Sequence, residues 1–122
     1  GAGGHAGLFG TARGVVEFGL EILRGRLLSP AALEEMCRPQ TPERALGWQR
    51  RHPHWSGGSL CSPRSIGHVG FTGTGLWIDL DRGIAWTLLT NRVHPTRDAE
   101  TGIQDLRRAV GNRVAARGHS WA

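Results

Sequence analysis

The sequence predicts an α+β fold in which an antiparallel sheet of about three strands packs against N-terminal helices and a C-terminal helix. Apolar residues recur at helical spacing near both ends of the chain, whereas the middle alternates short apolar runs with turn residues. Consecutive strands joined by tight turns, without intervening helices, favour antiparallel pairing. A length of 122 residues suffices for one domain with one hydrophobic core.

The first 40 residues are predicted to be helical. Thr11 is a suitable N-cap for a helix that runs to about Arg24, and Gly25 follows as a helix-ending residue. Its expected apolar stripe consists of Val15, Phe18, Ile22 and Leu23. A short second helix is expected to begin at Ser29-Pro30, to face inward with Leu33 and Met36, and to end before Pro39.

Strands are predicted between residues 41 and 95. The segments 65–71, 76–79 and 84–90 are the three expected strands, and 45–48 is a further candidate. Residues 49–64 contain two prolines and a Gly-Gly pair, and are expected to form an irregular, flexible loop. The segment 79–83, Asp-Leu-Asp-Arg-Gly between two apolar runs, is the clearest hairpin signal in the chain.

Residues 96–117 are predicted to contain the closing helix. Thr101 and Gln104 have the spacing of a capping box, with Thr101 as the N-cap. The expected apolar face consists of Ile103, Leu106, Val110 and Val114. The arginines expected to stay in water are Arg107, Arg108, Arg113 and Arg117.

Composition excludes several classes of function. The formal charge is +5, and all fifteen basic residues are arginines scattered along the chain, which favours a solvated surface over a nucleic-acid partner. Six histidines and two cysteines show no zinc-ligand spacing, so we expect no metal and no cofactor. No apolar run is long enough for a transmembrane segment.

The chain begins at Gly1 within a glycine-rich stretch and has no initiating Met. We therefore expect it to be a segment of a longer protein, whose targeting signals could lie upstream. Localisation stays open.

Two stretches are more specific as sequence motifs than the rest of the chain. Residues 4–12 read Gly-His-Ala-Gly-Leu-Phe-Gly-Thr-Ala, and residues 67–74 read Gly-His-Val-Gly-Phe-Thr-Gly-Thr. Leu-Trp-Ile-Asp and then Leu-Leu-Thr-Asn-Arg-Val-His-Pro follow at 76–79 and 88–95. In this order and spacing they resemble the C-terminal portion of serine β-lactamase-related hydrolases, a superfamily of penicillin-binding proteins, D-alanyl-D-alanine peptidases, class C β-lactamases and esterases. The resemblance extends from Gly3 to about Val114.

The resemblance implies a partial active site. Such enzymes act on amide or ester bonds through an acyl-serine, using S-x-x-K, a Tyr or Ser, and a K-T-G or H-T-G strand. Residues 68–70 match the third motif, so His68, Gly70 and Phe71 are the implied catalytic residues. Gly70 would leave space for substrate, and the Phe71 N–H would donate to the oxyanion. The implied substrate-binding residues are Val69, Thr72 and Gly73.

The sequence departs from the family in ways that affect activity. Val69 stands where relatives usually have Thr, which favours ester hydrolysis over peptidase or β-lactamase specificity. The chain contains no lysine and no tyrosine, so S-x-x-K and a tyrosine relay cannot be present in it. We therefore expect no turnover by this chain alone.

The implied partners are a small-molecule or peptide substrate and the missing N-terminal part of the same domain. That part would pair beside the strand near residues 85–90. The alternative is a non-enzymatic remnant, or an interaction module that completes a split enzyme. His5 is assigned no chemistry.

Overall fold

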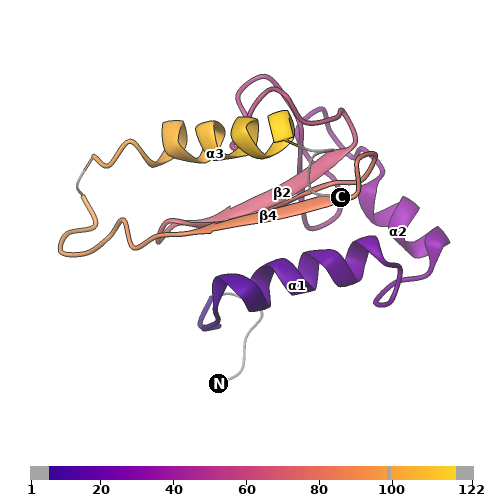
Figure 1. Ribbon diagram of the computed structural model, residues 1–122, viewed down its shortest axis with the longest axis horizontal. Coiled ribbons are helices and arrows are strands. Elements are labelled where there is room, and N and C mark those ends of the chain that lie inside the picture. Colours follow the sequence, from indigo (N-terminus) through magenta and orange to yellow (C-terminus); the bar gives the residue numbers. More distant parts are fainter. Residues whose placement is uncertain (1–5, 99, 118–122) are drawn as a thin grey trace.

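A four-stranded antiparallel sheet separates two helices that lie on its opposite faces (Figure 1). The computed structural model describes residues 6–98 and 100–117. The elements are α1 (Ala12–Leu23), α2 (Pro30–Cys37), β1 (Gln49–Arg50), β2 (Ser65–Gly70), β3 (Thr74–Asp79), β4 (Ile84–Leu89) and α3 (Ile103–Arg117). The strand order is β1-β2-β3-β4. The predicted α+β class with an antiparallel sheet is therefore confirmed, with one short additional strand.

The two N-terminal helices begin where the sequence predicts. The Thr11 Oγ1 atom accepts a hydrogen bond from the Gly14 N–H at 3.0 Å, and the Ser29 Oγ atom accepts from the Ala32 N–H at 3.2 Å. Gly25 has a φ of +68°, a left-handed conformation that glycine adopts without steric cost and that ends α1. Local capping chemistry thus defines the ends of these helices.

The buried face of α1 differs from the predicted stripe by one position. Gly19 is buried against the sheet, and a Cβ added to it would lie 3.1 Å from the Ala85 Cβ and 3.2 Å from the Leu76 Cδ1. Phe18, which was expected to face inward, is 50% exposed. The absence of a side chain at Gly19 lets α1 approach β3 and β4 closely, which explains the difference.

The hairpins that form the sheet follow the predicted turns. Ser65 pairs with Asp79, and Gly70 pairs with Thr74 at the other end of the β2–β3 ladder. The Asp79 carboxylate accepts hydrogen bonds from the Ser62 N–H and Oγ–H at 2.8 and 2.6 Å, and from the Arg82 N–H at 3.1 Å. This buried carboxylate therefore fixes the β3–β4 turn to the segment that precedes β2.

The candidate strand at 45–48 was wrong. Arg44 forms an isolated bridge with Gln49, and the residues between them form a tight turn closed by a hydrogen bond from the Ala45 N–H to the Trp48 carbonyl at 2.9 Å. Gly47 has a φ of +75°, a turn conformation. The short strand β1 begins only after this turn, at Gln49.

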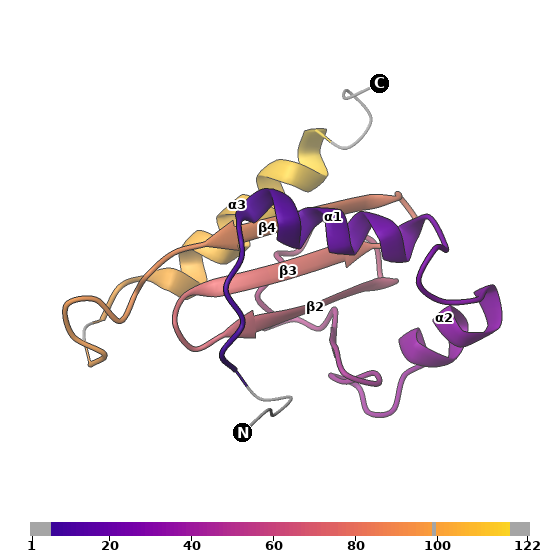
Figure 2. The same cartoon turned by 90° about the horizontal axis from the view of Figure 1, so that it is seen from below.

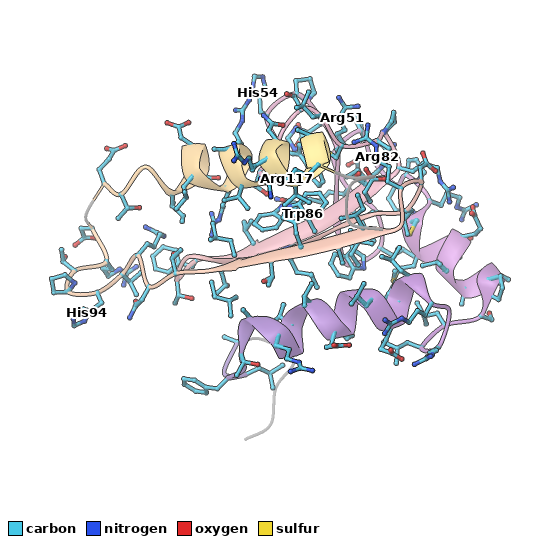
Figure 3. All side chains as sticks on the ribbon, viewed as in Figure 1. Arg51, His54, Arg82, Trp86, His94 and Arg117 are labelled. Carbon is cyan, nitrogen blue, oxygen red and sulfur yellow. The ribbon has the colours of Figure 1, made fainter. Side chains whose placement is uncertain are left out.

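The segment between β1 and β2 is packed rather than flexible, contrary to the prediction. Trp55 and Cys61 are 2% and 3% exposed, and they pack with Trp77 and Trp86 in the core between the sheet and α3. The Trp77 indole N–H donates to the Ser56 Oγ atom at 3.0 Å. Figure 3 shows Trp86 between α3 and the sheet. Indole side chains supply the apolar area that anchors this irregular segment.

The closing helix begins one residue later than the capping box requires, and the face that it buries differs from the predicted apolar face. Gly102 precedes α3, and its carbonyl accepts from the Leu106 N–H at 3.1 Å, so Gly102 rather than Thr101 is at the N-cap. Leu106 is 46% exposed, whereas Arg107 is 2% exposed. The prediction that Leu106 is buried and Arg107 solvated was wrong, and the reason lies in the contacts of Arg107 described below.

Candidate functional site

An open groove of about 550 Å³ runs along the end of β2 on the face of the sheet that α1 covers. The residues that line it are Leu8, Phe9, Gly10, Val15, His68, Val69, Gly70, Thr72, Thr74, Gly75, Leu76 and Leu89. Figure 2 shows the segment before α1 crossing the end of β2. The two stretches singled out in the sequence, around residues 8 and 68, therefore meet in space.

His68 and Val69 point to opposite faces of the sheet. His68 is exposed and lines the groove, and its Nδ1 atom lies 2.9 Å from the Val69 carbonyl oxygen. Val69 is half-buried and packs against the core that contains Trp77 and Trp86. Alternation along a strand explains this arrangement. The imidazole can reach a molecule in the groove, and Val69 both lines the groove and packs on the core.

A side chain at position 70 would crowd its own hairpin. A Cβ built on Gly70 would collide with the Thr74 Oγ1 atom, because the two residues are paired directly across β2 and β3. We expected a glycine here to leave space for substrate. The collision with Thr74 supplies an independent structural reason for the same residue.

The loop after β2 is tied to the residues that follow β4. The Phe71 carbonyl accepts from the Arg92 Nε–H, the Thr72 carbonyl accepts from the Arg92 N–H at 3.0 Å, and the Gly73 carbonyl accepts from the Thr90 N–H and Oγ1–H at 2.9 and 2.7 Å. The Arg92 guanidinium also lies 4.3 Å from the centre of the exposed Phe71 ring. Contacts from residues 90–92 therefore hold this loop, in addition to the hydrogen bond from the Gly73 N–H to the Gly70 carbonyl at 3.1 Å within its own hairpin.

Arg107 is a functional candidate that the sequence analysis missed. Its Nη2 atom donates to the Gly70 and Thr74 carbonyl oxygens, both at 2.9 Å. Burial lowers the pKa of this guanidinium, and the nearby charge of Arg92 lowers it further. Position 107 lies four residues after Ile103 and three before Val110, so the helical period itself placed it on the inner face. The position was nevertheless predicted to be exposed, because its residue is an arginine.

His54 and two buried serines are engaged in local or core contacts away from the groove. The His54 N–H donates to the His52 Nδ1 atom at 3.3 Å in a local turn, and Figure 3 shows His54 on the α3 side of the sheet. Ser56 and Ser62 are buried and hydrogen-bonded to core residues. In residues 6–98 and 100–117, no group of three or more His, Cys, Asp or Glu side chains could hold a metal ion. His5 lies outside the described residues.

One edge of the sheet is formed by β4. In the described part of the chain β4 pairs with β3 alone, so its outer backbone groups face no other strand. None of the described helices is long and apolar enough to cross a membrane.

Comparison with known proteins gives a consistent result. A family model described as Beta-lactamase matches residues 1–110. Among solved structures, a β-lactamase from Mycobacterium bovis is 26% identical in sequence and superimposes with a TM-score of 0.68 over 83% of this chain. The match covers 42% of the M. bovis protein, so this chain spans less than half the length of that structure. No curated protein sequence matches.

Proposed function

This chain belongs to the β-lactamase family, and from that premise we propose that it forms the C-terminal part of one serine hydrolase domain. The proposed reaction is hydrolysis of an amide or ester bond through an acyl-serine intermediate. The observation that carries the proposal is the open groove in which the exposed His68 and the bare backbone of Gly70 lie together.

In this proposal the groove forms one wall of the active site. His68 orients the substrate or assists proton transfer, since its ring is accessible from the groove. The backbone N–H of Phe71 lies just beyond the β2–β3 ladder and donates to the oxyanion. Thr72 and Gly73 shape the substrate-binding loop next to Phe71. Val69 contacts the substrate from the groove that it lines, and it also holds β2 on the core, where its side chain packs.

The other wall comes from the rest of the domain. The nucleophilic serine, its lysine and the relay residue belong to residues outside this segment, because the chain contains no lysine and no tyrosine. The open edge of β4 supports this view, since it offers a pairing surface for the remaining strands of the sheet. We therefore expect this polypeptide alone to be inactive.

The test compares this polypeptide with a longer protein in which the preceding part of the proposed domain is joined to its N-terminus. Hydrolysis of a p-nitrophenyl ester and of nitrocefin is measured for both, with heat-treated protein as the blank. We expect turnover by the longer protein only, with the ester as the better substrate. Turnover by residues 1–122 alone, or none by the longer protein with either substrate, contradicts the proposal.

Variants of the longer protein assign the groove. His68→Ala should lower kcat/KM, whereas His54→Ala should leave it unchanged, because His54 lies on the α3 side of the sheet. Equal effects of the two substitutions would mean that the groove is not the active site.

A second candidate function is a non-enzymatic module that completes a sheet in another chain. The edge position of β4 favours it. Size-exclusion chromatography of this polypeptide mixed with the N-terminal part of the domain distinguishes the two. Stable association without restored hydrolysis supports the module, and association with hydrolysis supports the enzyme.

A nucleic-acid partner is not part of the proposal. Arginines that are paired with carboxylates at 2.6–3.9 Å in this fold are Arg24, Arg26, Arg38, Arg64 and Arg82. Pairing with acidic side chains reduces the positive charge available to phosphates.

A further inference from the structure

Arg107 is a buried cation whose partners are backbone carbonyls. It is 2% exposed, and within the described residues no carboxylate lies at salt-bridge distance from it. Its Nε atom is also buried without an acceptor among those residues. A charge removed from water is unfavourable unless it is well compensated. The burial of an arginine on a helix that otherwise packs with valines therefore needs a structural or functional explanation.

The two acceptors of Arg107 close the β2–β3 ladder. Gly70 and Thr74 are the last pair in the register, and one nitrogen, Nη2, donates to the carbonyls of both. Because Nη2 carries two hydrogens, each carbonyl can receive one. Hydrogen bonds from a charged donor are stronger than those between neutral groups. The guanidinium therefore connects the two strands at the point where the substrate loop begins.

The Gly70 carbonyl and the Phe71 N–H belong to the same peptide unit. This unit is planar, and in the trans form its C=O and N–H point in opposite directions. The Gly70 oxygen accepts from the Gly73 N–H at 3.1 Å as well as from Arg107. Arg107 is therefore a second anchor for this oxygen, and fixing the oxygen also fixes the direction of the Phe71 N–H, which points away from the guanidinium. A positive charge at the oxygen polarises the peptide group and strengthens its N–H as a donor.

We infer that Arg107 is a positioning residue, which orients and polarises the Phe71 N–H through the Gly70 carbonyl. Its catalytic consequence rests on the proposed function, in which that N–H donates to the oxyanion. The effect on the backbone does not depend on the proposed function. Arg107 itself does not touch the substrate.

Three variants test the inference in the longer hydrolase. Arg107→Met keeps most of the volume but removes the donors, Arg107→Lys keeps the charge, and Arg113→Met removes an exposed arginine from the same helix as a control. Loss of one oxyanion donor lowers kcat by about 10²–10³-fold, so a misdirected donor should cost about 10–100-fold. We expect Arg107→Met to lower kcat by that factor with KM nearly unchanged, Arg107→Lys to recover part of it, and Arg113→Met to match the wild type.

A second readout separates this inference from the proposed function. Amide ¹⁵N relaxation of residues 70–73 is measured in the 122-residue polypeptide, for the wild type and the same variants. Higher mobility of the Phe71 amide in Arg107→Met, with Arg113→Met unchanged, supports positioning even if no hydrolysis is found. If Arg107→Met does not fold, the comparison is made with Arg107→Lys.

Two results would overturn the positioning role of Arg107. Unchanged mobility at Phe71 in the folded Arg107 variants overturns it, whatever the activity. A fall in kcat that follows only the fraction of folded protein, measured by circular dichroism, also overturns it and leaves Arg107 a purely structural residue. Absence of activity in the wild-type longer protein rejects the proposed function, and the relaxation data then decide the inference alone.

Discussion

The contact that a Cβ at position 70 would make with Thr74 leads to a quantitative prediction about the stability of the fold. Introducing a Cβ by Gly70→Ala places it against the Thr74 Oγ1 atom, whereas the Thr74 Cβ would be 3.6 Å away, an ordinary contact. Relief therefore requires rotation of one side chain rather than separation of the strands. Overpacking costs about 1–3 kcal/mol, and replacing a strand glycine by alanine returns about 0.5–1 kcal/mol. We expect a net loss of about 1 kcal/mol.

Urea unfolding of the wild type, both single variants and Gly70→Ala/Thr74→Ala completes a double-mutant cycle. For a slope near 2 kcal/mol per molar, Gly70→Ala should lower the unfolding midpoint by about 0.5 M without changing the slope. In the Thr74→Ala background the same substitution should be neutral or stabilising, because the colliding oxygen is gone. The expected coupling free energy is about 1 kcal/mol or more.

Additive effects of the two substitutions would refute this reasoning, because Thr74 would then not be the reason for the glycine. The cycle also separates two roles of Gly70. If the double variant in the longer hydrolase is folded but inactive, space for substrate is a second requirement at this position. If it is folded and active, the sequence-based reason for Gly70 is wrong.

Three further predictions concern the scaffold around the site. Gly111→Ala should destabilise the fold despite its gain in helix propensity, because the new Cβ would collide with the Gly57 backbone carbonyl. Gly14→Ala should instead stabilise the fold by up to about 1 kcal/mol, because its Cβ would meet only the Thr11 Oγ1 atom at 3.4 Å, an ordinary contact. Thermal unfolding that shifts in the same direction for both variants would contradict this. Asp79→Asn should lower the free energy of unfolding in urea by about 1–3 kcal/mol, because an amide cannot satisfy all three donors that the carboxylate accepts from; no loss beyond error would show that the lost acceptor is unimportant. Burial raises the pKa of the Cys61 thiol, so its contribution to stability is complete below the ordinary thiol pKa of about 8.5 and is lost as pH rises through the raised folded value. The urea midpoint of the wild type should fall as the pH is raised from 7 to 10, and the midpoint of Cys61→Ala should fall less. Equal falls of the two midpoints would exclude Cys61 as a cause.

Features determined by neighbouring residues could be predicted from the sequence. The Thr11 and Ser29 caps, the left-handed Gly25 and the turn after Asp79 all depend on contacts within a few positions along the chain. Their residue types have few alternative uses, so pattern and structure agree. The Gly70–Phe71 motif was identified through the family resemblance, and its role in catalysis stays a prediction.

The predictions of buried helix positions were wrong where the surface packed against the helix decides which side chain fits. Adjacent helix positions differ by about 100° around the axis, so the choice between Phe18 and Gly19, or between Leu106 and Arg107, depends on the shape of the sheet opposite. Phe18 is excluded from the sheet face because Ala85 and Leu76 leave room only for a glycine. The acceptors of Arg107 lie 37 and 33 positions away in the chain, beyond the reach of a periodicity argument.

The sequence by itself determined the α+β class, the ends of α1 and α2, the order of the hairpins and the family resemblance. The first three follow from short-range capping, turn chemistry and hydrophobic period, whereas the resemblance rests on the motifs at residues 4–12, 67–74 and 88–95. Only the tertiary structure decided that Val69 packs on the core while His68 is exposed in the groove, that a Cβ at position 70 would meet the Thr74 hydroxyl, and that Arg107 holds the end of the ladder. The physical reason is that burial and hydrogen-bond satisfaction depend on groups brought together across the whole chain, so a charged residue can lie inside wherever two distant carbonyls compensate it.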